Sequence, residues 1–156
     1  MLRRAHQFTT QIGTMHVVEE NGAIIKVLLP GKKEPVDERK VTPLLEKAAV
    51  QISEYLAGER KEFTLPLNLE GSEFAVKVWR EMATIPYGEV RTYGELAQAI
   101  GRPGAARAVG QACIHNPIPI MIPCHRVVGT GGKLTGYAGG LALKKRLLEL
   151  EKDALL

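Results

Sequence analysis

The sequence predicts an α/β fold in two small domains, residues 1–71 and 72–156, of which the second is mainly helical. A turn signal, Asn21-Gly22, lies between two runs of β-forming residues near the N-terminus. From Ser72 onward, apolar residues recur with helical spacing instead. The charge balance changes at the same point, since residues 1–71 carry 10 basic and 10 acidic side chains and residues 72–156 carry 11 and 7. A chain of 156 residues is long enough for two such domains.

The first domain begins with three predicted strands, which cover residues 8–13, 14–20 and 23–29. A loop over 30–40 follows. Thr42 is the expected N-cap of a helix that has Pro43 in its first turn and ends at Gly58. The apolar stripe of this helix consists of Val41, Leu44, Leu45, Ala48, Ala49, Ile52, Tyr55 and Leu56. Residues 63–69 form an extended segment or an edge strand, because Pro66 has no N–H to donate.

The composition is that of an ordinary globular protein, with 45% hydrophobic and 24% charged residues. No apolar run reaches the length of a membrane span, and no hydrophobic core of a signal peptide follows the first basic residues. Two cysteines, Cys113 and Cys124, do not suggest a disulfide framework, so we expect a cytoplasmic protein with reduced thiols. His6 and His16 have no cysteine or acidic partner at ligand spacing, so we expect no metal site.

The second domain opens with a helix that Ser72 caps and Pro86 ends. Its core face is predicted to comprise Phe74, Val78, Trp79, Met82 and Ile85. Thr92 and Glu95 then form a capping box, which starts a short helix. A turn at 101–104 leads to a second helix over 105–115. Two short helices joined by a glycine-containing turn are typical of a helix-turn-helix, although a helical hairpin in a core gives the same pattern.

The second of these helices favours contact with nucleic acid. Small residues, including Ala106 and Gly110, would let its backbone approach a groove closely, although they would also serve helix packing. Arg107 is a long basic side chain among them. Residues 74–146 carry 10 basic against 3 acidic side chains, which indicates a basic patch for a polyanion; a solvated surface with an excess of charge is the alternative.

Residues 118–122 are apolar enough for a buried strand that leads to the segment Pro123-Cys-His-Arg-Val127. The thiolate is the reactive form of cysteine, and a neighbouring imidazole and positive charge raise its fraction. Adjacent residues do not share a face, so we expect His125 to reach the Cys124 thiol through water. A buried structural cysteine is the alternative. A glycine-rich turn at 129–133 and a helix over 141–150 complete the domain.

These motifs together resemble those of the O6-alkylguanine-DNA alkyltransferases, which are suicide DNA-repair proteins. The resemblance covers about half of the chain, from Phe74 to Glu151, and rests on Arg107-Ala-Val-Gly, Asn116-Pro117, Pro123-Cys-His-Arg-Val127 and Gly136-Tyr-Ala-Gly-Gly140. It implies a ribonuclease-H-like α/β fold for the first domain and a DNA-binding and alkyl-acceptor role for the second. The structural zinc that some members bind through N-terminal cysteines does not carry over, because no cysteine precedes position 113.

The resemblance also implies the chemistry. The thiolate of Cys124, formed through water to His125, displaces guanine from the alkyl group in line. Glu151 would orient His125 and stabilise its cationic form. Tyr93 would help to rotate the 3′ phosphate and hydrogen-bond the guanine, and Asn116 would tie the helix-turn-helix to the active-site turn. Because a thioether has no hydrolytic exit, each molecule would act once, and no cofactor is implied.

The same resemblance assigns the remaining site residues. Arg107 would fill the gap left by a flipped nucleotide, on a helix that lies in the minor groove of duplex DNA. The DNA-binding set is completed by Thr92, Ala106 and Gly110. The guanine pocket would be lined by Val127, Tyr137, Ala138 and Lys144. Ala138 stands where the family often has a serine that helps to hold the guanine oxygen, so a hydroxyl contribution is lost here.

The expected partner is therefore alkylated DNA, with no membrane and with a monomeric protein. Two other functions fit parts of the sequence. A DNA-lesion binder without catalysis would share the fold, but such proteins replace the nucleophile that this chain keeps in Cys124. A cysteine hydrolase with a Cys-His-Glu arrangement would leave Arg107 and the localised basic charge without a role.

Overall fold

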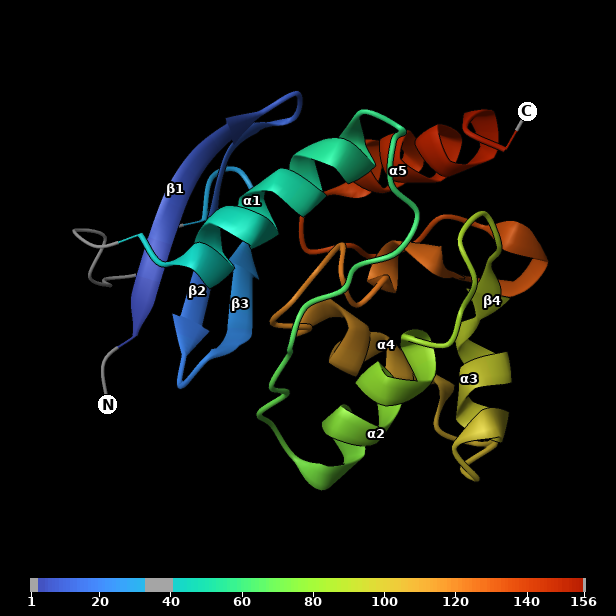
Figure 1. The fold of residues 1–156 in the computed structure, drawn as a ribbon. Helices are drawn as coiled ribbons and strands as arrows, with labels where there is room; N and C mark the ends of the chain where they lie inside the picture. Colours follow the sequence, from blue (N-terminus) through green and yellow to red (C-terminus); the bar gives the residue numbers. More distant parts are fainter. Residues whose placement is uncertain (1–2, 33–40, 156) are drawn as a thin grey trace. The chain divides into compact units, whose positions relative to one another are not determined.

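The computed structural model describes residues 3–32 and 41–155 and divides the chain into two compact units (Figure 1). The first unit comprises Met1–Leu69 together with Pro117–Pro119, and the second comprises Glu70–Asn116 and Ile120–Leu156. Nothing in the sequence pattern predicts that Pro117–Pro119 belong to the first unit. Of the described residues, no helix combines the length and the apolar character needed to cross a membrane.

The first unit is built on a three-stranded antiparallel sheet in the order β1-β2-β3. The strands are β1 (Arg4–Thr10), β2 (Gly13–Glu20) and β3 (Ala23–Leu28). Between β2 and β3, Asn21 and Gly22 have φ values of 53° and 76°. Two consecutive positive φ values are the signature of a type I′ hairpin turn, which confirms the turn prediction. The strand predicted over 8–13 is displaced: β1 begins at Arg4, which pairs with Glu19, and ends at Thr10, which pairs with Gly13.

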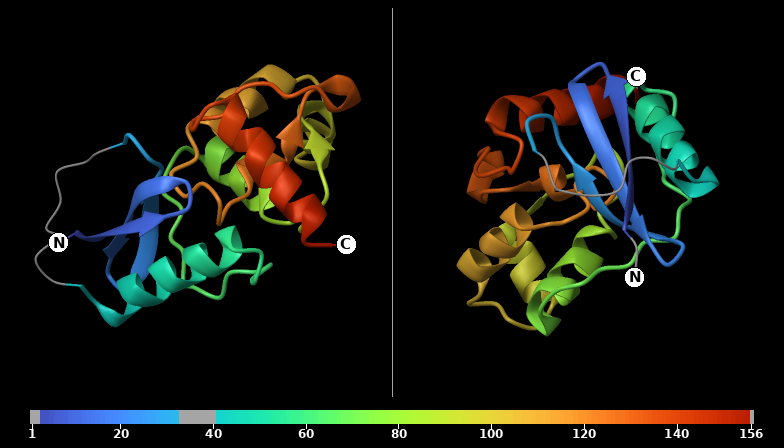
Figure 2. Two further views of the ribbon diagram at one scale, coloured as in Figure 1. Left: turned by 90° about the horizontal axis from the view of Figure 1, so that it is seen from above. Right: turned by 90° about the vertical axis from the view of Figure 1, so that its left-hand side faces the viewer.

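Helix α1 (Pro43–Leu56) packs on one face of this sheet, as both views in Figure 2 show. The side chain of its N-cap, Thr42, accepts a hydrogen bond from the Leu45 backbone N–H at 3.2 Å, as predicted. The predicted stripe is buried from Leu45 to Leu56, but Val41 is exposed, since it precedes the cap and lies outside the helix. Most of the loop predicted over 30–40 lies outside the described residues.

Residues 63–69 form an extended segment with a single bridge to the sheet. The Ile24 N–H donates to the Pro66 carbonyl at 2.8 Å, and the Asn68 N–H donates to the Ile24 carbonyl at 2.9 Å. The pairing stops there because the nitrogen of Pro66 carries no hydrogen.

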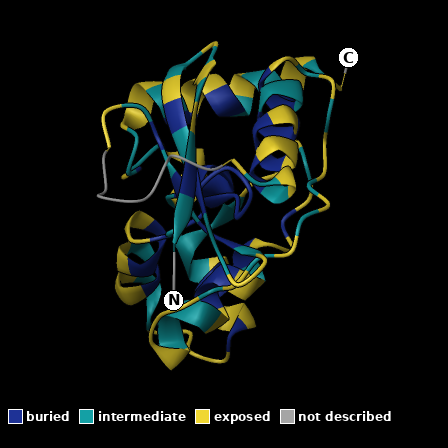
Figure 3. Cartoon of the chain, turned by 60° about the vertical axis from the view of Figure 1, so that its left-hand side comes forward, coloured by how far each residue is buried: buried dark blue, intermediate teal, exposed yellow. Residues whose placement is uncertain are grey.

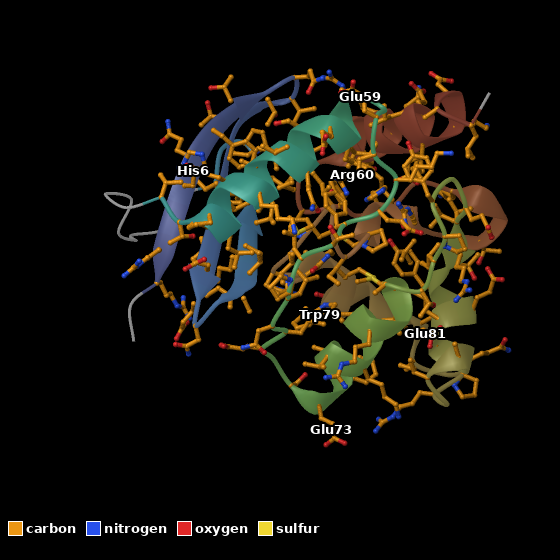
Figure 4. All side chains as sticks on the ribbon, viewed as in Figure 1. His6, Glu59, Arg60, Glu73, Trp79 and Glu81 are labelled. Atoms are coloured by element: carbon orange, nitrogen blue, oxygen red, sulfur yellow. The ribbon has the colours of Figure 1, made fainter. Side chains whose placement is uncertain are left out.

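The second unit contains four α-helices among the described residues, each with one buried and one exposed face (Figure 3). They are α2 (Glu73–Met82), α3 (Tyr93–Ala99), α4 (Ala106–Ile114) and α5 (Leu141–Asp153). The predicted caps are present, because Ser72 accepts from the Ala75 N–H and Thr92 forms a capping box with Glu95. Helices α2, α3 and α4 pack together. The indole of Trp79 on α2 (Figure 4) donates to the Ala112 carbonyl of α4 at 2.8 Å.

A short parallel pairing joins the helix-turn-helix to the cysteine segment. Strand β4 (Arg91–Thr92) pairs with β5 (Val127–Val128), so that Arg91 faces Val127 and Thr92 faces Val128. Thr92 is also the N-cap of α3. The start of the helix-turn-helix is thereby fixed to the chain three and four residues after Cys124.

The strand predicted over 118–122 is wrong. These residues are buried as expected, but they form turns, and Ile120 has a φ of 75°. Pro117, Pro119 and Pro123 lie in or beside the segment, and each lacks the backbone N–H that a ladder would need. Positive φ at a β-branched residue is rare and strained, so tertiary packing holds the turn.

Candidate active site

Cys124 begins a single turn of 3₁₀-helix, Cys124–Arg126, immediately after Pro123. The residue is buried, with 3% of its surface exposed. Burial raises the pKa of the Cys124 thiol from 9.0 to about 11, against the opposing effects of a hydrogen bond from Asn116 and the positive charge of Lys144. In the DNA-free protein the sulfur is therefore protonated at neutral pH, and a base is needed to activate it.

Asn116 follows the C-terminal end of α4 and reaches back to the cysteine turn. Its side-chain amide donates to the Ile122 carbonyl at 2.8 Å, and Asn116 itself is buried. The Cys124 N–H also donates to the Ile122 carbonyl, at 2.8 Å. The Ile122 carbonyl thus accepts hydrogen bonds both from the Asn116 side chain, which follows the helix-turn-helix, and from the backbone of Cys124.

His125 and Glu151 form a fully buried pair. The His125 Nε2 atom lies 2.6 Å from the Glu151 Oε2 atom, and neither side chain has any exposed surface. Burial lowers the pKa of His125 below its ordinary value, while the hydrogen bond and the negative charge of Glu151 oppose that effect. Glu151 is the residue that the resemblance assigned to orient His125. In the structure Glu151 lies inside α5, which runs to Asp153.

Arg126 is the principal member of the site that sequence reasoning missed. Its Nε and Nη2 atoms each donate to Glu151 at 2.9 Å, and its Nη1 atom donates to the Ile85 carbonyl at 2.7 Å. The Gly88 N–H donates to the same carboxylate at 2.9 Å. The sequence shows only a cation directly after the Cys-His pair; the burial of Arg126, which requires a carboxylate partner, is visible only in the structure.

Lys144, Thr135 and Tyr93 form a second network. The Lys144 ammonium donates to the Thr135 carbonyl at 2.7 Å and lies 5.8 Å from the centre of the Tyr93 ring. The Tyr93 hydroxyl donates to the Thr135 carbonyl at 3.2 Å and accepts from the Thr135 hydroxyl at 3.1 Å. Burial lowers the pKa of Lys144 and raises that of Tyr93. Sequence reasoning did not find Thr135, which belongs to no motif.

A surface hollow of about 500 Å³ lies over α3, α4 and the segment after Cys124. It is lined by all four residues predicted to bind DNA and by Tyr93: Thr92, Tyr93, Ala106, Arg107 and Gly110. Thr135 and Gly136 line it as well. Arg107 is exposed. Gly110 has only the Tyr93 ring near the position of a Cβ atom, at 3.8 Å, so the α4 backbone is accessible from this side.

The predicted pocket residues lie deeper. Val127 and Tyr137 are buried, and Ala138 is partly exposed. Burial raises the pKa of Tyr137 well above its ordinary value, and the Tyr137 hydroxyl has no hydrogen-bond partner in the part of the chain that the structure describes. A buried phenol of this kind has a donor to offer to a bound molecule.

The arrangement provides a buried thiol, a histidine–carboxylate base and a groove with an exposed arginine, all within the second unit. This combination fits transfer of a group to sulfur from a molecule bound in the groove. No group of three or more His, Cys, Asp or Glu side chains in residues 3–32 and 41–155 is placed to hold a metal ion. His6 lies on β1 (Figure 4), where its ring stacks on that of Phe8.

Comparison with known proteins gives consistent matches along the chain. The family model "6-O-methylguanine DNA methyltransferase, ribonuclease-like domain" matches residues 4–69, and the model "6-O-methylguanine DNA methyltransferase, DNA binding domain" matches residues 73–153.

Individual relatives carry related names. A methylated-DNA–protein-cysteine methyltransferase of Mycolicibacterium paratuberculosis is 61% identical over 105 residues, which cover 67% of this chain and 64% of that protein. The chain thus spans just under two thirds of the length of this relative. The constitutive methylated-DNA–protein-cysteine methyltransferase of Bacillus subtilis is 46% identical over 151 residues, which cover 92% of each chain. The crystal structure of Mycobacterium tuberculosis OGT in complex with DNA superposes with a TM-score of 0.90 at 42% identity and covers 97% of this chain and 94% of that one.

Proposed function

Because this chain belongs to the 6-O-methylguanine DNA methyltransferase family, we propose that it repairs DNA by moving the alkyl group of an O6-alkylguanine to the sulfur of Cys124. The observation that carries the proposal is the buried thiol of Cys124, directly followed in the chain by His125, which pairs with Glu151, in the same unit as a groove lined by Arg107 and Tyr93. The relatives in mycobacteria and Bacillus subtilis are named for transfer from methylated DNA to a protein cysteine.

The chemistry is an in-line displacement. The proton of the Cys124 thiol passes to His125 through water, and a sulfur lone pair forms the new bond to the alkyl carbon. The bond between that carbon and guanine O6 breaks, and its electron pair leaves with guanine. The guanine anion then takes a proton, so that it and His125 both end neutral. Tyr93 and backbone N–H groups act as donors to the developing charge. Because the thioether is stable, one molecule repairs one base.

The groove over α3 and α4 supports a role in base flipping. Arg107 is exposed on a helix of small residues, where it can occupy the space that an extruded base leaves in the duplex. The free thiols of Cys113 and Cys124 favour a reducing compartment, which is why we place the protein in the cytoplasm.

Intact-mass spectrometry tests the proposal directly. Wild-type protein and Cys124→Ala are incubated with a duplex oligonucleotide that contains one O6-methylguanine. We expect a gain of one methylene unit per molecule on the wild type alone, at most once per molecule. Binding without any mass gain would point to a lesion binder instead. Repeated turnover of an ester or amide substrate would favour a cysteine hydrolase.

A further inference from the structure

The Glu151 carboxylate is the centre of a closed cluster of charges. It has no exposed surface, and it accepts hydrogen bonds from His125, from the Arg126 guanidinium and from the Gly88 backbone. Both oxygens are used, since Arg126 Nη2 donates to Oε2 and Arg126 Nε donates to Oε1. A carboxylate in such a position is held as an anion only if a cation remains beside it.

Arg126 is held in place from several sides. Its Nη1 atom donates to the Ile85 carbonyl at 2.7 Å, and its guanidinium lies 5.5 Å from the centre of the Tyr87 ring. Only 7% of its surface is exposed. Arginine remains charged at any pH at which the protein is folded, so this cation is permanent. A lysine would offer a charge without the two-pronged geometry.

The two hydrogen bonds from Arg126 to Glu151 determine which tautomer His125 adopts. An ionised carboxylate 2.6 Å from Nε2 accepts the Nε2 proton, which leaves Nδ1 as the ring nitrogen that can take up another. The positive charges of Arg126 and Lys144 both oppose a second proton on the ring. The charged and titratable groups that act on the His125–Glu151 pair are Lys144 from α5, Arg126 from the 3₁₀ turn, and Tyr87 from the connection after α2.

We propose that Arg126 is a positioning residue for the alkyl transfer: it keeps Glu151 anionic and so holds His125 as the neutral Nε2–H tautomer, with Nδ1 as the base for the Cys124 proton. This inference rests on the proposed function. The new element is the role of Arg126, since the neutral His125 base is already part of the proposed transfer. The protonated thiol of Cys124 in the DNA-free protein agrees with it.

Single-turnover rates measured against pH test this role. Arg126→Met removes the charge, Arg126→Lys keeps the charge without the fork, and Arg80→Met makes the same chemical change at an exposed position on α2. Without the cation, the buried His125–Glu151 pair binds a proton more tightly, so we expect the acidic limb of the profile to move to higher pH in Arg126→Met. The rate at neutral pH should fall by about tenfold or more, while the Kd for duplex DNA stays the same. Arg126→Lys should keep the wild-type limb at a lower rate, and Arg80→Met should match the wild type.

A purely structural arginine would give a different result. Arg126→Met would then lose folded protein, and the folded fraction would show the wild-type pH profile, which overturns the inference. If Arg126→Met does not fold, the ¹⁵N spectrum of the wild-type histidines decides. A neutral Nε2–H form of His125 at neutral pH supports the proposal, and an imidazolium or an Nδ1–H form overturns it. Wild-type protein that transfers no alkyl group would instead contradict the proposed function itself.

Discussion

Lys144 is buried, although its neighbours in the sequence suggest an exposed side chain. With Lys145 and Arg146 it forms a run of three cations, for which a solvated helix face is the ordinary interpretation. The structure buries Lys144 completely, together with Leu147 and Glu151 on the same face of α5. These positions are spaced by three and four residues, so helical periodicity does place them together. The Thr135 carbonyl accepts a hydrogen bond from the buried Lys144 ammonium and so offsets part of the cost of its burial.

Lys144→Met is expected to raise the pKa of the Cys124 thiol further, because the charge of Lys144 lowers that pKa in the wild type. Alkylation of Cys124 by iodoacetamide below pH 9 should slow by on the order of threefold to tenfold, which corresponds to half to one pKa unit. Peptide mapping separates Cys124 from Cys113. Lys145→Met, at a lysine whose side chain is 68% exposed, is the matched control. Equal rates in both variants would show that Lys144 does not act on the thiol.

Arg107→Ala is expected to slow repair of duplex DNA without slowing the chemistry. Unpairing a base costs a few kcal/mol, and a side chain that fills the gap offsets part of this cost, so the transfer rate from duplex O6-methylguanine should fall by about tenfold or more. Transfer from the free O6-methylguanine nucleoside should be unchanged, because no base has to be flipped. The two rates are compared with those of Arg80→Ala. A parallel loss on both substrates would place Arg107 in the chemical step.

The start of helix α3 is defined by a short sequence motif, the capping box of Thr92 and Glu95. Thr92 Oγ1 accepts from the Glu95 N–H at 3.1 Å, and the Glu95 carboxylate accepts from the Thr92 N–H at 2.8 Å. The spacing of Thr and Glu predicts both bonds. The pairing of Thr92 with Val128 in β5 is not visible in the sequence, because it joins residues that lie far apart in the chain.

Loss of this cap has an expected cost to stability. Thr92→Ala removes the acceptor for the Glu95 N–H and should lower the free energy of unfolding by about 1 kcal/mol. Urea unfolding followed by circular dichroism measures the difference. Thr92→Ser keeps the hydroxyl and should retain most of the stability. If serine and alanine destabilise the protein equally, the methyl packing of Thr92 matters more than its cap.

The segment before Cys124 shows where element prediction fails. The apolar run Ile118–Ile122 has the composition of a buried strand, and its burial was predicted correctly. Its backbone turns instead, with Ile120 at positive φ and with the chain passing from the first unit to the second between Pro119 and Ile120. The Val27 N–H of β3 donates to the Pro117 carbonyl at 3.0 Å. Contacts between residues that lie far apart in the chain thus select a backbone conformation that the local sequence disfavours.

At the scale of the whole molecule, the buried His125 links the stability of the folded state to pH. Burial lowers the pKa of His125 in the folded protein below 6.5, its ordinary value in the unfolded chain. Below about pH 6.5 the unfolded chain therefore binds a proton that the folded protein excludes. The free energy of unfolding should decrease between about pH 7 and pH 5, with a contribution from His125 of up to about 1.4 kcal/mol per pH unit.

Chemical unfolding across this range measures the slope. In His125→Gln the contribution of this titration disappears, so its curve should be flatter than that of the wild type. Other groups titrate alike in the two proteins, which makes the difference between the curves specific to His125. Superimposable curves would mean that the folded protein accepts the proton at His125.

The sequence by itself determined the hairpin turn, the caps of three helices and the helix-turn-helix pattern, and it pointed to the segment around Cys124 that we propose to be reactive. Each of these depends on residues that are close in the chain, where side-chain chemistry and backbone preference act directly. Only the tertiary structure decided that Arg126 forms an ion pair with Glu151, that Lys144 is buried against Thr135, and that the backbone of residues 118–122 forms turns. A buried charge is stable only beside a partner brought from elsewhere in the chain, and local sequence does not identify that partner.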